Sequence, residues 1–104
     1  MIEAIKQLFG FGPKVDYADL VKNGAMILDV RSKHEFSSGH IRGSVNISLS
    51  QLPANLPKLK DKDKPIIACC ASGARSSAAK RILKSNGYTQ VYNGGSWMSL
   101  KNKI

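Results

Sequence analysis

Two short apolar runs constrain the fold of this chain more than any other feature. Residues 25–30 read AMILDV and Ile66–Cys70 read IIACC, and both runs are almost wholly apolar. A strand that is buried on both faces of a parallel sheet has this composition. Helical patterns follow both runs, so strands and helices alternate along the chain. We therefore predict an α/β fold in which a small, mainly parallel sheet is flanked by helices on both faces.

Turn and capping signals predict the remaining elements. The helices begin after a capping residue or a break, and the further strands are short. We expect helices over residues 17–24, 32–38 and 75–86, a helical piece after Ser50, and strands over residues 44–47 and 90–92. Ser50 is the expected cap of its helical piece, which Pro53 and Pro57 interrupt. The last strand is expected to end before a turn at Gly94 and Gly95.

The length and composition suit a single compact domain. The chain has 104 residues, of which 42% are apolar and 22% charged, and this is enough for one hydrophobic core. Gly10, Gly12 and Pro13 separate the first residues from the rest. We predict an N-terminal extension over residues 1–13 and a domain over residues 14–104. The short amphipathic turn of the extension is expected to dock on the domain, with docking on a partner as the alternative.

The charge pattern bears on the class of partner. The net charge is +9, and four of the lysines lie at alternate positions over residues 58–64 together with two aspartates. A charge run without interleaved aromatic residues is typical of a solvated loop rather than of a nucleic-acid site. No apolar stretch approaches the about 20 residues of a membrane helix, and the first residues lack the pattern of a signal peptide. We therefore predict no nucleic-acid partner, no membrane span and a cytoplasmic location.

The cysteines and histidines bear on redox state and on metals. Cys69 and Cys70 are the only cysteines and are adjacent, which excludes a disulfide framework and fits a reducing cytoplasm. His34 and His40 do not complete a zinc motif with this pair. We therefore expect no metal.

Residues 68–77, ACCASGARSS, join the second apolar run to a helix and carry the expected chemistry. Gly73 permits a left-handed backbone, so residues 71–75 can curl around Cys70 with their N–H groups pointing inward. The helix N-terminus adds about half a positive charge. A thiol in such a cradle has its pKa lowered from ~8.5 towards neutrality, so Cys70 is a candidate nucleophile. The alternative of a plain buried cysteine does not explain the small residues that follow it.

Two separated motifs carry a resemblance to a known family. The first is the loop Cys70-Ala71-Ser72-Gly73-Ala74-Arg75-Ser76, and the second consists of Asp29-Val30-Arg31, Glu35-Phe36, Gly39-His40-Ile41, Gly43 and Asn46-Ile47. They are similar to the active-site loop and the upstream signature of the rhodanese family of sulfurtransferases. The resemblance spans about residues 28–95, which is most of the chain. It implies a rhodanese-like fold and a reaction that needs no cofactor. In that reaction Cys70 takes the outer sulfur of a donor such as thiosulfate as a persulfide. The acceptor is cyanide in vitro and a thiol or a sulfur-carrier protein in the cell.

The resemblance also implies roles for individual residues. Cys70 is the expected catalytic residue. The expected binding loop for a small anionic sulfur donor consists of Ala71, Ser72, Gly73, Ala74, Arg75 and Ser76. We expect a supporting hydrogen-bond and salt-bridge network that fixes the loops from Asp29, Arg31, Glu35 and His40. The less favoured alternative is a direct catalytic role, such as His40 as a general base. Two positions depart from the family pattern: Ala71 stands where many thiosulfate-using members have a basic residue, and the only tryptophan is Trp97, whereas the family's usual tryptophan position is Ser99.

Two other functions remain open at this point. Cys69 and Cys70 are compatible with a redox-sensing or protein-interaction module that uses the cysteine pair. The spacing from Cys69 to Arg75 is that of cysteine-dependent phosphatases, although the loop holds no acidic residue to protonate a leaving group. Adjacent strand residues point to opposite faces, so we expect Cys69 to be a core residue. The basic surface suits a sulfur-carrier or thiol-reducing protein with an acidic face.

Overall fold

The described residues form a four-stranded parallel sheet with helices on both faces. The computed structural model describes residues 14–104, so the predicted extension over residues 1–13 lies outside the described residues. The strands are β1 (Met26–Asp29), β2 (Val45–Asn46), β3 (Ile66–Cys70) and β4 (Val91–Ser96). Their order in the sheet is β2-β1-β3-β4, and all neighbouring pairs are parallel. The predicted α/β class with a small parallel sheet is therefore confirmed.

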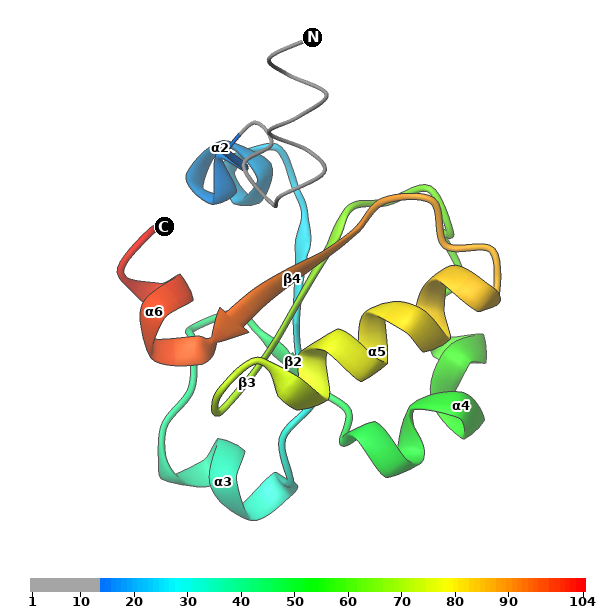
Figure 1. The fold of residues 1–104 in the computed structure, drawn as a ribbon, viewed down its shortest axis with the longest axis horizontal. Coiled ribbons are helices and arrows are strands. Elements are labelled where there is room, and N and C mark those ends of the chain that lie inside the picture. The colour runs from blue at the N-terminus through cyan, green and yellow to red at the C-terminus, as the bar shows by residue number, and fades with distance from the viewer. Residues whose placement is uncertain (1–13) are drawn as a thin grey trace, which may run out of the picture.

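The helices pack around this sheet in two layers. They are α2 (Tyr17–Lys22), α3 (Lys33–Ser38), α4 (Leu52–Asn55), α5 (Ala74–Ser85) and α6 (Trp97–Lys101), and short 3-10 turns over Leu49–Gln51 and Leu56–Lys58 flank α4. In Figure 1, α4 and α5 lie on one side of the strands, and α2 and α6 lie on the other. The short helix α3 follows β1 and lies beyond the ends of the strands.

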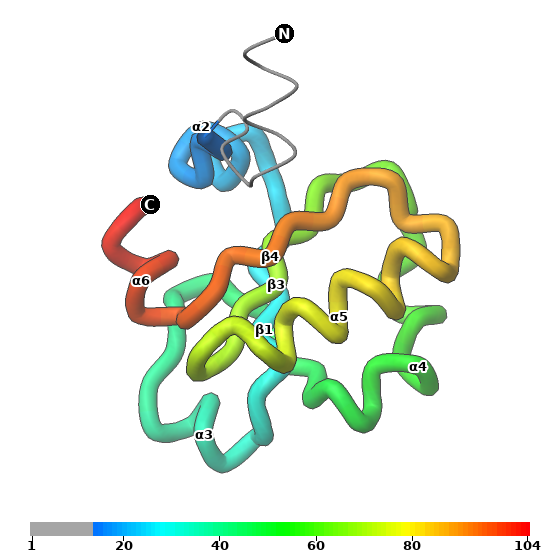
Figure 2. The backbone as a smooth tube through the Cα atoms, in the orientation of Figure 1, coloured from blue at the N-terminus to red at the C-terminus, as the bar shows by residue number. Residues whose placement is uncertain are grey.

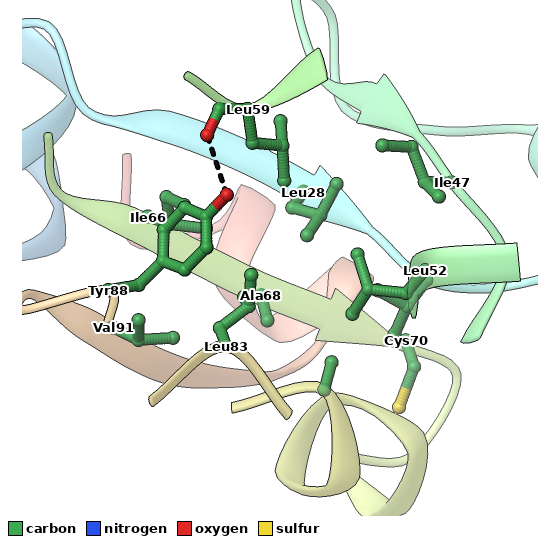
Figure 3. Packing of buried hydrophobic residues seen from close by; sticks show 12 residues of the cluster. Leu28, Ile47, Leu52, Leu59, Ile66, Ala68, Cys70, Leu83, Tyr88 and Val91 are labelled. Carbon is green, nitrogen blue, oxygen red and sulfur yellow. Dashed lines mark hydrogen bonds between the residues drawn. The ribbon is translucent and has the colours of Figure 1, made fainter. Parts of the chain in front are cut away.

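Two hydrophobic clusters form the core, one on each face of the sheet. The side chains of β3 alternate between them: Ile66, Ala68 and Cys70 belong to the cluster beneath α4 and α5, whereas Ile67 and Cys69 belong to the other. All five residues are buried, which explains why the sequence of this strand is apolar throughout. Figure 3 shows the first cluster, in which the Cys70 sulfur lies at the end of the strand.

The last strand differs from the prediction. It does not end at Tyr92 but continues through Gly94 and Gly95 to Ser96, and its pairing with β3 shifts there as in a β-bulge. Gly94 has no space for a side chain, because an added Cβ would lie 2.9 Å from a methyl carbon of Ile67. Gly95 has a φ of +79°, which favours glycine. The glycine pair is therefore a bulge within a strand rather than a turn after it.

Two helical features also differ from the prediction. Ser50 lies within the 3-10 turn Leu49–Gln51 and does not cap it. Residues Trp97–Lys101 form α6, which the sequence pattern did not predict, and the Ser96 hydroxyl caps it by accepting a hydrogen bond from the Ser99 N–H at 3.1 Å. Among the helices of residues 14–104, none combines the length and the apolar character needed to cross a membrane.

The parallel arrangement brings three strand ends together. The carboxyl ends of β1, β3 and β4 lie at the same edge of the sheet, and the loop that leads from β3 into α5 lies beside the end of β4 (Figure 2). Ligands of parallel sheets bind at this edge. It holds Asp29 at the end of β1, Cys70 at the end of β3 and the bulge of β4.

Candidate active site

Cys70 is the last residue of β3, and a tight loop wraps its sulfur. The residue is fully buried. Gly73 has a φ of +104°, and its N–H donates to Cys70 Sγ at 2.9 Å. Ser76, in the first turn of α5, places its Oγ 3.5 Å from the same sulfur. The loop therefore surrounds the sulfur with hydrogen-bonding groups at the start of a helix.

These surroundings lower the pKa of the Cys70 thiol. Burial alone would raise the pKa, because it disfavours the charged form. Hydrogen bonds from the Ser76 hydroxyl and from the backbone N–H groups of Ser76, Gly73 and Ser72 favour the thiolate and outweigh burial. The N-terminus of α5 points its positive dipole end at the same place. Cys70 therefore ionises more readily than a free cysteine.

Cys69 points to the opposite face and lacks these donors. It is fully buried in the second cluster with Ile67 and Leu100. Burial, followed by the nearby charge of Asp29, raises its pKa to about 12. Both thiols are free. Cys69 faces the second cluster, whereas the Cys70 sulfur on the other face is wrapped by the loop. This geometry weakens both alternatives that rely on Cys69, the phosphatase and the paired-thiol module.

A buried ion pair stands at the end of β1. Arg31 Nη2 donates to Asp29 Oδ2 at 2.6 Å and Arg31 Nε donates to Asp29 Oδ1 at 2.9 Å. Arg31 also donates to the carbonyls of Glu35 and Gly39, and Asn46 Nδ2 donates to the carbonyls of Asp29 and Arg31. The hydrogen bond with Asp29 is the main cause of the raised pKa of Arg31. This network joins β1, β2 and α3.

A second ion pair joins α3 to the loop around Cys70. Arg75 Nη1 donates to Glu35 Oε1 at 2.6 Å, and Arg75 Nη2 donates to Glu35 Oε2 at 2.9 Å. Glu35 also completes a capping box with Ser32 at the start of α3. The hydrogen bonds from Arg75 and Ser32 lower the pKa of Glu35 to about 2. At neutral pH the Arg75 guanidinium is therefore already held by a carboxylate.

His40 takes part in neither ion pair. Its exposed ring stacks on Phe36 with 3.7 Å between the ring centroids, and its Nδ1–H donates to the Phe36 carbonyl at 2.7 Å. The predicted four-residue network is therefore divided into two ion pairs and a histidine that braces α3. Within residues 14–104, no three histidine, cysteine or acidic side chains are grouped so as to hold a metal ion.

Asn93 is a residue of this edge that the sequence did not single out. Its Oδ1 accepts a hydrogen bond from the Ser76 hydroxyl at 2.6 Å. Its Nδ2 donates to the Gly73 carbonyl at 3.3 Å, within the loop. Asn93 stands directly before the glycine pair at the carboxyl end of the last strand. This position in the sequence is what could have identified it as a residue of the site.

Trp97 reaches the same edge from the start of α6. Arg31 Cζ lies 4.7 Å from the centroid of the Trp97 ring, a cation–π contact. An added Cβ at Gly39 would lie 3.2 Å from the ring, so the indole also covers this glycine. The tryptophan that departs from the family spacing therefore packs on the Asp29–Arg31 pair.

Comparisons with known proteins point to one family. The profile of the rhodanese-like domain family matches residues 14–102. An uncharacterized protein of Bacillus subtilis, YqhL, is 42% identical over 69 residues, and the thiosulfate sulfurtransferase GlpE of Stutzerimonas stutzeri is 37% identical over 70 residues. These matches cover 66% and 67% of this chain but only 54% and 63% of the two relatives. A solved structure described as a rhodanese with anions from E. coli has a TM-score of 0.69 and 30% identity, over 73% of this chain and 91% of the other.

Proposed function

Because this chain belongs to the rhodanese-like domain family, we propose that it is a sulfurtransferase that carries sulfane sulfur as a persulfide on Cys70. The observation that carries the proposal is the position of Cys70 Sγ, 2.9 Å from the Gly73 nitrogen and 3.5 Å from the Ser76 hydroxyl oxygen. Donors in these positions stabilise the thiolate, which is the nucleophilic form of cysteine. The same donors suit the negative charge of a persulfide.

In the first step the Cys70 thiolate attacks the outer sulfur of a donor such as thiosulfate. A bond forms between Cys70 Sγ and that sulfur, the sulfur–sulfur bond of thiosulfate breaks, and sulfite leaves with the electron pair. The step needs no external oxidant or reductant. Ala71 and Ala74 carry small, exposed side chains, so the backbone N–H groups of the loop are open to an anionic donor. The positive end of the α5 dipole adds to this attraction.

In the second step an acceptor attacks the outer sulfur of the persulfide. With cyanide a carbon–sulfur bond forms, the sulfur–sulfur bond of the persulfide breaks, thiocyanate leaves and Cys70 returns as the thiolate. In the cell we propose a thiol or a sulfur-carrier protein as the acceptor. The net charge of +9 favours a partner with an acidic face. A reducing compartment such as the cytoplasm suits this cycle, because each turn returns Cys70 as a free thiolate.

The supporting residues act on this cycle through the position of the loop. The Glu35–Arg75 pair holds α3 against the first turn of α5, and the Asp29–Arg31 pair holds the end of β1 to α3 and β2. His40 braces α3 through Phe36. None of these side chains hydrogen-bonds to the Cys70 sulfur in the described residues, so we assign them to positioning rather than to the chemical step.

The test compares the two adjacent cysteines. Wild type, Cys70→Ala and Cys69→Ala are assayed for sulfur transfer from thiosulfate to cyanide, and intact mass is recorded after donor treatment. We expect Cys70→Ala to lose both the activity and the added sulfur atom, while Cys69→Ala retains both, because Cys69 lies in the core. Loss of added sulfur only in Cys69→Ala, or no added sulfur in wild type, would contradict the proposal and favour the redox-sensing or phosphatase alternatives.

A further inference from the structure

The hydroxyl of Ser76 has more acceptors around it than it has protons. Ser76 is fully buried, and its Oγ lies 2.6 Å from Asn93 Oδ1, 3.0 Å from the Gly73 carbonyl oxygen and 3.5 Å from Cys70 Sγ. A serine hydroxyl carries one proton and accepts through two lone pairs. It donates to the sulfur only when it does not donate to one of the two oxygens. The group that accepts the Ser76 hydroxyl proton therefore determines whether Ser76 can donate a hydrogen bond to the Cys70 sulfur.

Asn93 Oδ1 makes the shortest of the three contacts, and the orientation of its amide is determined. Oδ1 accepts a hydrogen bond from the Gly95 N–H at 3.0 Å, and Nδ2 donates to the Gly73 carbonyl at 3.3 Å. A flipped amide would place two donors, Nδ2 and the Gly95 N–H, against each other. The oxygen therefore faces Ser76, where it acts only as an acceptor.

The β4 bulge keeps Asn93 in this place. Gly94 follows Asn93 and is packed so closely that an added Cβ would lie 3.0 Å from a Leu100 methyl carbon and 3.1 Å from the Ala68 carbonyl oxygen. The backbone carbonyl of Asn93 accepts a hydrogen bond from the Tyr17 hydroxyl at 3.2 Å. The backbone of Asn93 is thus held by β4 and α2, which lie outside the loop that its side chain contacts.

From this arrangement we propose that Asn93 is a positioning residue for the sulfur: its amide oxygen holds the Ser76 hydroxyl proton and thereby controls whether Ser76 can donate to Cys70 Sγ. In the thiol form, the Cys70 S–H donates to Ser76 Oγ, and Ser76 donates to Asn93. In the thiolate form the hydroxyl turns its proton to the sulfur, and Asn93 Oδ1 keeps the Gly95 N–H as its remaining donor. When Cys70 ionises, its S–H bond breaks and the proton leaves to solvent, whereas the O–H bond of Ser76 stays intact and only turns. A role of Asn93 in catalysis rests on the proposed function. Its effect on the ionisation of Cys70 does not.

The charged and titratable groups near Cys70 come from three elements and the strand itself. They are the Arg75–Glu35 pair on α5 and α3, the Asp29–Arg31 pair at the end of β1, and the neighbouring thiol of Cys69. The sequence of β4, VYNGGS, has Tyr92 as its only titratable side chain, and Tyr92 packs on the opposite face of the sheet. A charge introduced at Asn93 would therefore be the first that β4 presents to this site.

The experiment measures the rate of Cys70 alkylation by iodoacetamide as a function of pH, with peptide mass mapping to assign the modified cysteine. Asn93→Asp places a carboxylate at the acceptor position, so we expect the midpoint of the profile to rise by about one pH unit or more. Asn93→Ala removes the competing acceptor, so we expect about two- to tenfold faster alkylation below the midpoint. The effect of Asn93→Ala should disappear in a Ser76→Ala background, because the residue acts through that hydroxyl.

Asn23→Asp is the matched control, since it makes the same charge change at an exposed asparagine that precedes the amino end of β1, and its profile should match wild type. An asparagine that merely anchors the loop gives the opposite result: Asn93→Ala would slow alkylation, because Ser76 would lose its place. Slower alkylation in Asn93→Ala would overturn the inference. So would an unchanged pH profile in Asn93→Asp, or an effect of Asn93→Ala that persists in the Ser76→Ala background.

Alkylation reports the ionisation of Cys70 whether or not the chain transfers sulfur. If the profiles shift as expected but donor treatment adds no sulfur to wild type, the proposed function fails and the role of Asn93 stands. If sulfur is added but the profiles of the Asn93 variants do not shift, the role of Asn93 fails and the proposed function stands.

Discussion

Two arginine–carboxylate pairs stand at the same edge of the sheet in different surroundings. In each pair two nitrogens of the guanidinium contact both oxygens of the carboxylate. The Asp29 and Arg31 side chains are 0% and 5% exposed, whereas those of Glu35 and Arg75 are 36% and 37% exposed. The chemistry of the two pairs is thus alike, and the access of water differs.

This difference separates a structural role from a role in the site. A buried charge that loses its partner cannot be solvated by water. Removing one partner of the Asp29–Arg31 pair should therefore destabilise the fold strongly. The Glu35–Arg75 pair is screened by water, so it adds little to stability. We propose that this pair, which lies next to the Cys70 loop, is the one that can exchange partners with an anionic ligand.

Breaking the buried pair should give the largest effect on stability. Arg31→Ala leaves the Asp29 carboxylate buried without its partner, and we expect the free energy of unfolding to fall by about 3–5 kcal/mol. Urea denaturation followed by circular dichroism measures this loss. Arg42→Ala removes an exposed arginine and should change stability by no more than about 0.5 kcal/mol. Equal losses in the two variants would contradict a stabilising role for the buried Asp29–Arg31 pair.

Neutralising the exposed carboxylate should change activity more than stability. Glu35→Gln keeps an oxygen for the capping box with Ser32 but leaves the positive charge of Arg75 unpaired. We expect kcat/KM for thiosulfate to rise about two- to tenfold, because the site gains a net positive charge towards an anion. The gain should shrink with added salt. A fall in kcat/KM at every salt concentration would mean that the closed pair is itself required for transfer.

The smallest expected effect is a dependence on pH. The Glu35 carboxyl has a pKa of about 2 in the folded chain against an ordinary value of 4.5. Because the folded value is the lower one, the stabilisation is present above the ordinary pKa and is lost as the pH falls through about 2. The difference in urea midpoint between wild type and Glu35→Gln should therefore shrink towards zero as the pH falls across this window. A difference that grows towards low pH would contradict the ion pair as its source.

Local patterns account for the parts of the fold that were predicted. Ile66–Cys70 is an apolar run because all five side chains are buried, and the strand has the predicted bounds. The side chains of Asp16 and Ser32 cap the first two described helices by accepting hydrogen bonds from the backbone N–H groups three positions further along. The Cys70 loop was recognisable because its small residues, its glycine and the start of a helix are contiguous in the sequence.

The parts that were not predicted depend on contacts between distant residues. The glycine pair was interpreted as a turn because glycines usually punctuate strands, but Gly94 is required by the close approach of Ile67 and Leu100. The short helix α6 buries only Leu100 among its residues, which is too little for a periodic apolar pattern. The supporting charges were expected to form one network, because the sequence does not show which side chains face each other.

The sequence by itself determined the family, the alternation of strands and helices, and the cysteine that stands at the tip of a buried strand, because these depend on composition, short motifs and local spacing. The tertiary structure decided which partners the polar groups have. Glu35 meets Arg75 across 40 residues, and Asn93 meets Ser76 across 17. Such contacts arise only when parallel strands bring their carboxyl ends to one edge, and the fold around that edge then determines which ion pair is buried and which is exposed to water.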